Sequence, residues 1–350
     1  MNIKKYLFDL PKLLDNFEDK NFIENFNRFK KSYKIKDLTI IECSFESNFK
    51  LNGFDDDYIK KLKLNNIDFK VDDLVISSIR IIDSKFDSKF EIKNRVIKDF
   101  KFENSNVEGV FDSFKSEIEK PYFYKSIFKG FAAFEDVCFG NQQEKDNKEF
   151  LTIFRYVTFM DFSSFRGTKF SSGLDFSKTN LKDKPNFLGI YVDSKNTKRE
   201  TFRIIKNSFD DAGNNIEANK YFVEEMKAYR RELKIKGCSW FSRLILFLNR
   251  WISNFGSNYM LPIGWLIASI FIFSEIIDWH SSFFIENKYF WNSSFDNLSI
   301  KANNFARGFL PLSRFLVGRS GIEFISLLFY ILFAVLTWQI IVAVKRHTQR

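Results

Sequence analysis

Large apolar residues recur at alternating intervals of five and six in the middle of this chain. The first run is Phe123, Phe128, Phe134 and Phe139, and after a polar insertion the second run is Phe154, Phe159, Phe165, Phe170, Phe176, Leu181 and Phe187. We call these positions the ladder. A step of five carries an α-helix about 140° beyond one full turn, so successive members would leave a shared helical face. In a flat strand, an odd step puts successive side chains on opposite faces.

A step that suits neither a helix nor a flat strand suits a chain that turns a corner about every five residues. Such turns keep each ladder side chain pointing inward, and stacked coils bury these side chains in internal columns. The eleven-residue spacing of Phe154 and Phe165 would also fit a right-handed helical supercoil. Gly167, Gly173 and Pro185 are poor helix formers and argue against that alternative. The pattern therefore predicts a β solenoid.

The ladder has a second feature, which is a small or apolar residue two positions before many of its members. Examples are Val157 before Phe159 and Thr168 before Phe170. With this feature, the stretches SIFKGFAAFEDVCF and TFMDFSSFRGTKFSSGLDFSKTNL resemble the pentapeptide-repeat family. The resemblance implies a right-handed quadrilateral β-helix with about four repeats per coil. The six-residue steps depart from the family rule, and we expect bulged corners or an imperfect register there.

Changes in pattern along the chain predict four domains. Weaker steps of five, such as Ile92 and Ile97, extend the solenoid towards the N-terminus. After Val192 the pattern becomes helical, with Gly213 as a stop signal. The predicted domains are an N-terminal helical cap at 1–34, a mainly β solenoid at 35–192, a helical linker or cap at 193–236 and a membrane region at 237–350.

The membrane region is predicted from its apolar runs. Its expected parts are an interfacial helix at 240–253, a transmembrane helix at 260–279, an outer or re-entrant segment at 280–321 and a transmembrane helix at 322–344. Each transmembrane segment has about the 20 apolar residues needed to cross a bilayer. In the interfacial helix, aromatic and aliphatic side chains recur at helical spacing, with Arg243 and Arg250 mainly on the other side.

Charge is distributed unevenly along the chain, which has a net charge of +10. Residues 1–195 hold 34 Lys and Arg against 32 Asp and Glu, whereas residues 237–350 hold 10 against 5. Cations cluster before the first span and after the second, which predicts cytoplasmic N- and C-termini. Acidic residues near the start interrupt any signal-peptide core. We therefore expect a multi-pass protein of a bacterial inner membrane, with the lipid bilayer as a partner and the solenoid in the cytoplasm.

The order of helix, span, short apolar segment and span resembles the layout of two-span pore-loop channels. The Thr-Val-Gly-Tyr-Gly filter of potassium channels is absent, Gly308 is isolated, and Pro311 follows it closely. Arg307 and Arg314 would repel cations from a pore. Glu275, an acid within the first span, is either a functional site or a side chain that reaches the headgroups. A pore, which requires a homo-oligomer, and an ordinary outer loop both stay open.

The sequence predicts no catalytic, cofactor-binding or metal site. Its three cysteines (Cys43, Cys138 and Cys238) are odd in number and widely separated. The two histidines, His280 and His347, are too few and too far apart in the sequence to indicate a metal centre. The near-neutral solenoid also argues against nucleic-acid binding or mimicry. We predict a non-catalytic scaffold, anchored in a membrane, whose solenoid contacts a protein partner that the sequence does not identify. The alternative is an oligomeric two-span channel regulated by its solenoid.

Overall fold

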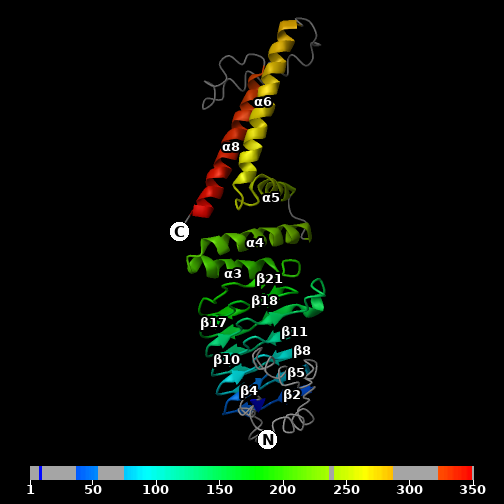
Figure 1. Cartoon of the computed structure of the whole chain (residues 1–350), viewed down its shortest axis with the longest axis vertical. Helices are drawn as coiled ribbons and strands as arrows, with labels where there is room; N and C mark the ends of the chain where they lie inside the picture. The colour runs from blue at the N-terminus through cyan, green and yellow to red at the C-terminus, as the bar shows by residue number, and fades with distance from the viewer. Residues whose placement is uncertain (1–7, 10–36, 54–74, 236–239, 287–321, 349–350) are drawn as a thin grey trace, which may run out of the picture. The chain divides into compact units, whose positions relative to one another are not determined.

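The computed structural model describes residues 8–9, 37–53, 75–235, 240–286 and 322–348 (Figure 1). The chain divides into two compact units, Met1–Asn214 and Asn215–Arg350, and each is described by itself. In the first unit, the strands of the described segments pair in parallel and form three sheets.

The first six-stranded sheet contains β1 (Phe8–Asp9), β4 (Phe49–Asn52), β7 (Phe90–Glu91), β10 (Phe111–Asp112), β13 (Ala132–Ala133) and β17 (Ser163–Ser164). The second contains β3 (Ser44–Phe45), β6 (Lys85–Phe86), β9 (Asn106–Val107), β12 (Ile127–Phe128), β16 (Thr158–Phe159) and β20 (Asn180–Leu181). The nine-stranded sheet contains β2 (Asp37–Ile41), β5 (Ile76–Ile82), β8 (Val96–Glu103), β11 (Glu117–Tyr124), β14 (Cys138–Phe139), β15 (Thr152–Arg155), β18 (Lys169–Phe170), β19 (Leu174–Asp175) and β21 (Tyr191–Val192).

The chain visits the three sheets in turn, and each coil stacks on the one before it. Phe123 in β11 is the register partner of Phe102 in β8, and Phe128 in β12 is the partner of Val107 in β9. One coil therefore takes 21 residues here. Parallel sheets stacked in this order fit the predicted solenoid and do not form a closed barrel.

In most of the described coils, two corners are made by residues with left-handed backbone conformations. One column of such residues contains Glu42, Asp83, Asn104, Lys125, Tyr156 and Lys178, and the other contains Asn94, Lys115, Asp136, Gly167 and Gly189. Positive φ is unfavourable for side chains other than glycine, so these corners need support. Part of that support is the backbone hydrogen bond to the next coil, as from Asn104 N to Tyr124 O at 3.0 Å.

Serine hydroxyls occupy the position two residues before the core residue in consecutive coils. The backbone N–H of Ser84 donates to Ser105 Oγ at 3.0 Å, and the N–H of Ser105 donates to Ser126 Oγ at 3.4 Å. The Ser126 hydroxyl donates in turn to the carbonyl of Tyr124. These small side chains satisfy backbone groups that the corner removes from the sheets, which explains why the sequence has small residues there.

The ladder side chains lie in the interior of the coils. All of them are buried except Leu181, which is half-buried. Rings from successive coils stack, with centroids 4.5 Å apart for Phe123–Phe154, 5.1 Å for Phe128–Phe159, 5.0 Å for Phe134–Phe165 and 5.5 Å for Phe139–Phe170. The polar insertion therefore leaves the aromatic columns in register on its two sides.

The N-terminal segment differs in part from the helical cap expected at 1–34. Phe8–Asp9 forms strand β1, which pairs with Leu51 and Asn52 of β4. The remainder of 1–34 lies outside the described residues. At the other end of the unit, helix α3 (Arg199–Asp211) follows the last strand and buries Phe202, Ile205 and Phe209.

The second unit is helical in the part that the structure describes. Its elements are α4 (Asn215–Ile235), α5 (Trp240–Ser253), α6 (Met260–Glu286) and α8 (Glu323–Thr348). Helices α6 and α8 lie side by side (Figure 1), and the Phe273 ring packs on Phe329 at 4.8 Å and on Phe333 at 5.9 Å. Met260–Trp279 and Glu323–Arg346 are long and apolar enough to cross a membrane.

The aromatic columns generate a stability prediction for two phenylalanines of different exposure. Phe123→Ala removes a fully buried ring that stacks on Phe154 in one neighbouring coil and contacts Phe102 in the other, and we expect it to lower the free energy of unfolding by about 3–5 kcal/mol. Phe162→Ala is the matched control, because that ring is 41% exposed, and it should cost less than about 1 kcal/mol. Circular dichroism of the full chain during unfolding in detergent measures both. Equal losses would show that the ladder is not the core.

Candidate functional site

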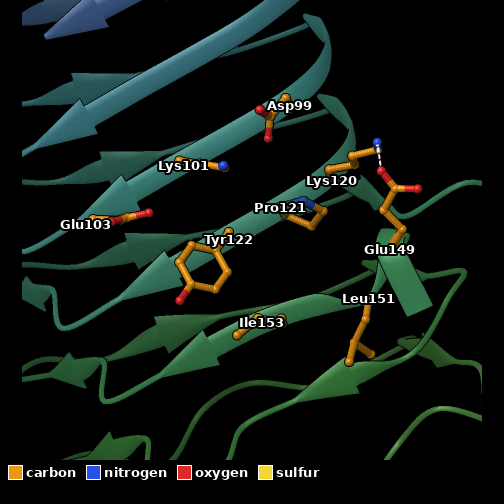
Figure 2. Close-up of a pocket in the computed structure, with 9 residues that line it drawn as sticks. All are labelled: Asp99, Lys101, Glu103, Lys120, Pro121, Tyr122, Glu149, Leu151 and Ile153. Carbon is orange, nitrogen blue, oxygen red and sulfur yellow. Dashed lines mark hydrogen bonds and ion pairs between the residues drawn. The ribbon is translucent and has the colours of Figure 1, made fainter.

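A groove on the outer side of the nine-stranded sheet is the main candidate site in the first unit (Figure 2). Its volume is about 520 Å³, within the range of ligand pockets, although it is open to solvent. It is lined by Asp99, Lys101, Glu103, Lys120, Pro121, Tyr122, Glu149, Leu151 and Ile153. These residues come from strands β8, β11 and β15 and from the polar insertion that precedes β15.

The floor of the groove is a row of outward side chains from three consecutive coils. Lys101, Tyr122 and Ile153 are register partners on β8, β11 and β15. Because side chains alternate along a strand, the outward position of Tyr122 follows from the burial of Phe123. Burial raises the pKa of Tyr122, and the charge of Glu103 raises it further. The phenol therefore stays protonated and able to donate a hydrogen bond at neutral pH.

One wall of the groove is the insertion between β14 and β15. A short 3₁₀ helix, η3 (Lys148–Phe150), is capped by the Asn147 side chain, which accepts from Glu149 N at 3.0 Å. The Glu149 carboxylate pairs with Lys120, and the Lys120 ammonium lies 5.2 Å from the centroid of the buried Phe150 ring. The insertion is thus held against β11, although the sequence suggested only a polar loop.

The groove combines polar groups that are available for binding with an aliphatic surface. Among the described residues, the side chains of Lys101, Glu103 and Tyr122 have no hydrogen-bond or ion-pair partner. Pro121, Leu151 and Ile153 supply the apolar part. Tyrosine beside aliphatic groups is typical of surfaces that contact proteins.

An aromatic edge continues from the groove along the adjacent corner. The Tyr124 ring stacks on Tyr122 at 5.9 Å and meets Tyr156 edge-on at 5.9 Å. The Lys178 ammonium lies over the Tyr156 ring at 4.7 Å and hydrogen-bonds its hydroxyl, which lowers the pKa of Tyr156. Lys125 lies over the Tyr124 ring in the same way, at 5.3 Å. The edge therefore extends the surface that the groove offers to a partner.

Two buried carboxylates in the first unit have strongly shifted pKa values. Burial alone would raise the pKa of Asp175, but hydrogen bonds from Ser177, Lys198 and Arg155 outweigh burial and lower that pKa to about 2. Arg155 Nη2 lies 2.9 Å and Lys198 Nζ 3.0 Å from Asp175 Oδ2. This ion cluster connects β15 and β19 to the N-cap residue of α3, which is a structural role.

Glu91 is the second such carboxylate. Burial opposes its ionisation, yet hydrogen bonds from Lys89 and Asn52 and the charges of Lys89 and Lys93 lower its pKa to about 2. Lys93 also pairs with Asp112 at 2.7 Å, so the cluster ties consecutive coils together. Neither the Asp175 nor the Glu91 carboxylate is among the residues that line the groove.

The described segments contain no assembled metal site, and the thiol of Cys138 is not activated. No three His, Cys, Asp or Glu side chains gather there as metal ligands would. Burial raises the pKa of Cys138, so its thiol stays protonated and poorly nucleophilic.

In the second unit, Arg346 joins three elements at the end of α8. Its guanidinium lies 4.6 Å from the centroid of the Phe222 ring of α4 and donates to the carbonyl of Phe255, in the turn between α5 and α6. Its own carbonyl accepts from Asn219 Nδ2 of α4 at 2.7 Å. Gly256 has a φ of +76°, and a Cβ there would lie 3.0 Å from Arg346 Nη1.

The turn itself has an unusual backbone, with positive φ at Asn254, Phe255 and Gly256 in succession. The Ser253 hydroxyl supports this turn and donates to Gln339 Oε1 of α8 at 3.0 Å. Trp265 Nε1 donates to the carbonyl of Trp251, so the start of α6 is also fixed to α5.

The residues expected at a membrane site are placed only in part. Glu275 is exposed on α6. Arg307, Gly308, Pro311 and Arg314 lie outside the described residues. Sequence reasoning missed the groove and the Arg346 contacts. Tyr122 and Tyr124 alternate with core residues along a strand, and Phe255 lies 91 residues before Arg346, so no local pattern could have located either feature.

Comparisons with protein-family models, with curated proteins and with solved structures gave no match.

The Asp175 cluster generates a prediction about pH. The folded-state pKa of about 2 lies below the ordinary value of 3.8, so the cluster stabilises the fold above about pH 4. That stability is lost as the pH falls through 2. Asp175→Asn should lower the free energy of unfolding by roughly 2 kcal/mol at neutral pH and flatten its fall between these two pH values. The free energy of unfolding measured across a pH series tests this prediction, and Asp183→Asn, at an exposed position, is the control. An unchanged pH dependence would contradict it.

The Arg346 contacts generate a prediction about the turn between α5 and α6. Arg346→Gln removes a charged donor from the Phe255 carbonyl and a cation from the Phe222 ring, losses of roughly 2–4 kcal/mol together. Hydrogen exchange of the amides at 254–258 should become faster in the full chain in detergent. The neighbouring, exposed Lys345→Gln is the control and should leave exchange unchanged. Equal exchange in both variants would mean that Arg346 does not hold the turn.

Proposed function

We propose that this chain is a non-catalytic scaffold, anchored in a membrane by α6 and α8, whose solenoid presents the groove to a protein partner. The observation that carries the proposal is the contrast between the two units. The first unit buries the phenylalanines of the ladder, whereas the two candidate spans expose large apolar side chains, such as Ile267 at 64% and Phe271 at 67% on α6 and Leu328 at 51% on α8. Such exposure is costly in water and favourable in lipid.

We further propose that the solenoid is a right-handed, four-sided coil of the pentapeptide-repeat type. The nine-stranded sheet supports four sides, because β14 pairs with the start of β11 and β15 pairs with its end. The long strand β11 thus corresponds to two short sides in the following coil. The small residues before the core positions, such as Ser105 and Ser126, add to this support.

The proposed orientation puts the solenoid in the cytoplasm of a bacterium. Lys345 and Arg346 lie at the end of α8 that contacts the turn after α5, and α5 adds Arg243 and Arg250. Glu275, Asp278 and Glu323 lie towards the other end of the helix pair. The helix pair therefore has a basic end and an acidic end, and the basic end of a membrane span is favoured on the cytoplasmic side.

The test is photo-crosslinking in cells. A benzophenone amino acid replaces Tyr122 in the full chain and in a chain of residues 1–214. We expect one discrete crosslinked product for both, in the membrane fraction for the full chain and in the soluble fraction for 1–214. The same amino acid in place of Leu188, which is 50% exposed and lies away from the groove, is the matched control and should give no product.

Four results would contradict the proposal. Equal yields of crosslinked product at positions 122 and 188 would mean random collision rather than recognition. No product at position 122 would mean that the partner does not bind the groove. Membrane retention of residues 1–214 would make the anchor assignment wrong. Ion flux through the purified chain in liposomes, abolished by Arg307→Gln, would favour the channel instead.

A further inference from the structure

Helix α5 has an exposed apolar face that is too large for a helix in water. Trp240, Phe241, Ile245 and Trp251 are 54–64% exposed, and together with Leu244, Phe247, Leu248 and Ile252 they span about 160° of the helix. Among the described residues, Trp265 lies against Trp251 and Arg230 lies near Phe247, and the rest of this face is left exposed.

The position of α5 relative to the spans suggests what covers it. The Trp251 ring lies 4.2 Å from the Trp265 ring of α6, and the Ser253 hydroxyl is bonded to Gln339 of α8. These contacts fix α5 beside the beginning of one candidate span and near the end of the other. At that level, an apolar face continuous with the spans meets the boundary between headgroups and acyl chains.

The charged side chains of α5 then determine which lipid headgroups can bind beside this face. At helical spacing, Arg243 and Arg250 project from the same edge of the apolar face, two turns and about 10 Å apart. Both are exposed, and neither forms an ion pair with any residue that the structure describes. Arg243 Nη2 donates to the carbonyl of Leu233 at 3.1 Å. This hydrogen bond orients the guanidinium but leaves its positive charge uncompensated.

The surroundings of this edge add positive charge. Arg230 of α4 lies 5.8 Å from the centroid of the Phe247 ring of α5. The sequence has no Asp or Glu between Leu233 and Ser274. A guanidinium binds a phosphate through paired hydrogen bonds, and two of them beside an apolar face match two anionic headgroups.

We infer that the Arg243–Arg250 edge of α5 binds the phosphates of anionic phospholipids. This inference rests on the proposed membrane anchoring and adds the class of lipid. Each arginine should strengthen the binding of an anionic lipid about fivefold relative to a neutral residue, and the pair about 25-fold.

The test is native mass spectrometry of the full chain, purified in a neutral detergent, with phosphatidylglycerol and phosphatidylcholine added at equal concentrations. We expect the chain to retain phosphatidylglycerol preferentially. The double variant Arg243→Gln/Arg250→Gln should bind it about 25-fold more weakly, with phosphatidylcholine binding unchanged. Arg243→Lys/Arg250→Lys should keep most of the preference. Arg166→Gln, an exposed arginine of the solenoid, is the control and should have no effect.

The outcomes separate this inference from the proposed function. Equal retention of the two lipids by the unaltered chain, or unchanged phosphatidylglycerol binding by the double Gln variant, would overturn the inference while anchoring stands. Displacement of the lipid by glycerol 3-phosphate at similar concentration would assign the edge to soluble phosphates and also overturn it. Release of the unaltered chain from membranes by alkaline carbonate would instead contradict anchoring itself. Unchanged melting of the variants shows that they fold.

Discussion

The solenoid depends on one constraint, which is that each coil must return its core side chains to the same place above the previous coil. Parallel pairing fixes the register, and a slip of one residue would turn a buried Phe outwards. The stacked pair Phe123 and Phe154 shows the constraint at work, since their rings are 4.5 Å apart although a polar insertion separates them. Left-handed corners such as Asn104 and Lys125 allow the chain to turn without disturbing this register.

The same constraint decides where the fold accepts extra residues and so where a site can form. An insertion inside a strand would break the register of every later coil, whereas an insertion between two sides leaves it intact. The segment between β14 and β15 is of the second kind. Among the described residues, an ion pair between Glu149 and Lys120 joins this segment to the neighbouring strand β11. The segment forms a wall of the groove beside Tyr122. The groove is thus a consequence of where the coil tolerates a longer connection.

Regular patterns in the sequence predicted the stacked coils and the two apolar helices, whereas features without such a pattern were missed. The ladder pattern predicted stacked coils because the spacing of Phe159, Phe165 and Phe170 is incompatible with a helix or a flat strand. The apolar runs predicted two helices able to span a membrane. The groove depends on how Lys101, Tyr122 and Ile153 line up across coils, and the intervals between them include an insertion whose path no local pattern encodes. Strand β1 was missed for a similar reason, because two residues are too short a segment to show a period.

The Arg346 contacts show why polar detail at the end of a span escapes sequence reasoning. A cation at that position is expected from the charge bias alone, and a lysine would satisfy the same bias. The structure adds a reason for arginine, since its planar guanidinium can lie on the Phe222 ring while one N–H reaches the Phe255 carbonyl. That carbonyl is available because Asn254, Phe255 and Gly256 all have positive φ and leave the helical hydrogen-bond pattern. The unusual turn and the arginine therefore explain each other, although 91 residues separate Arg346 from Phe255.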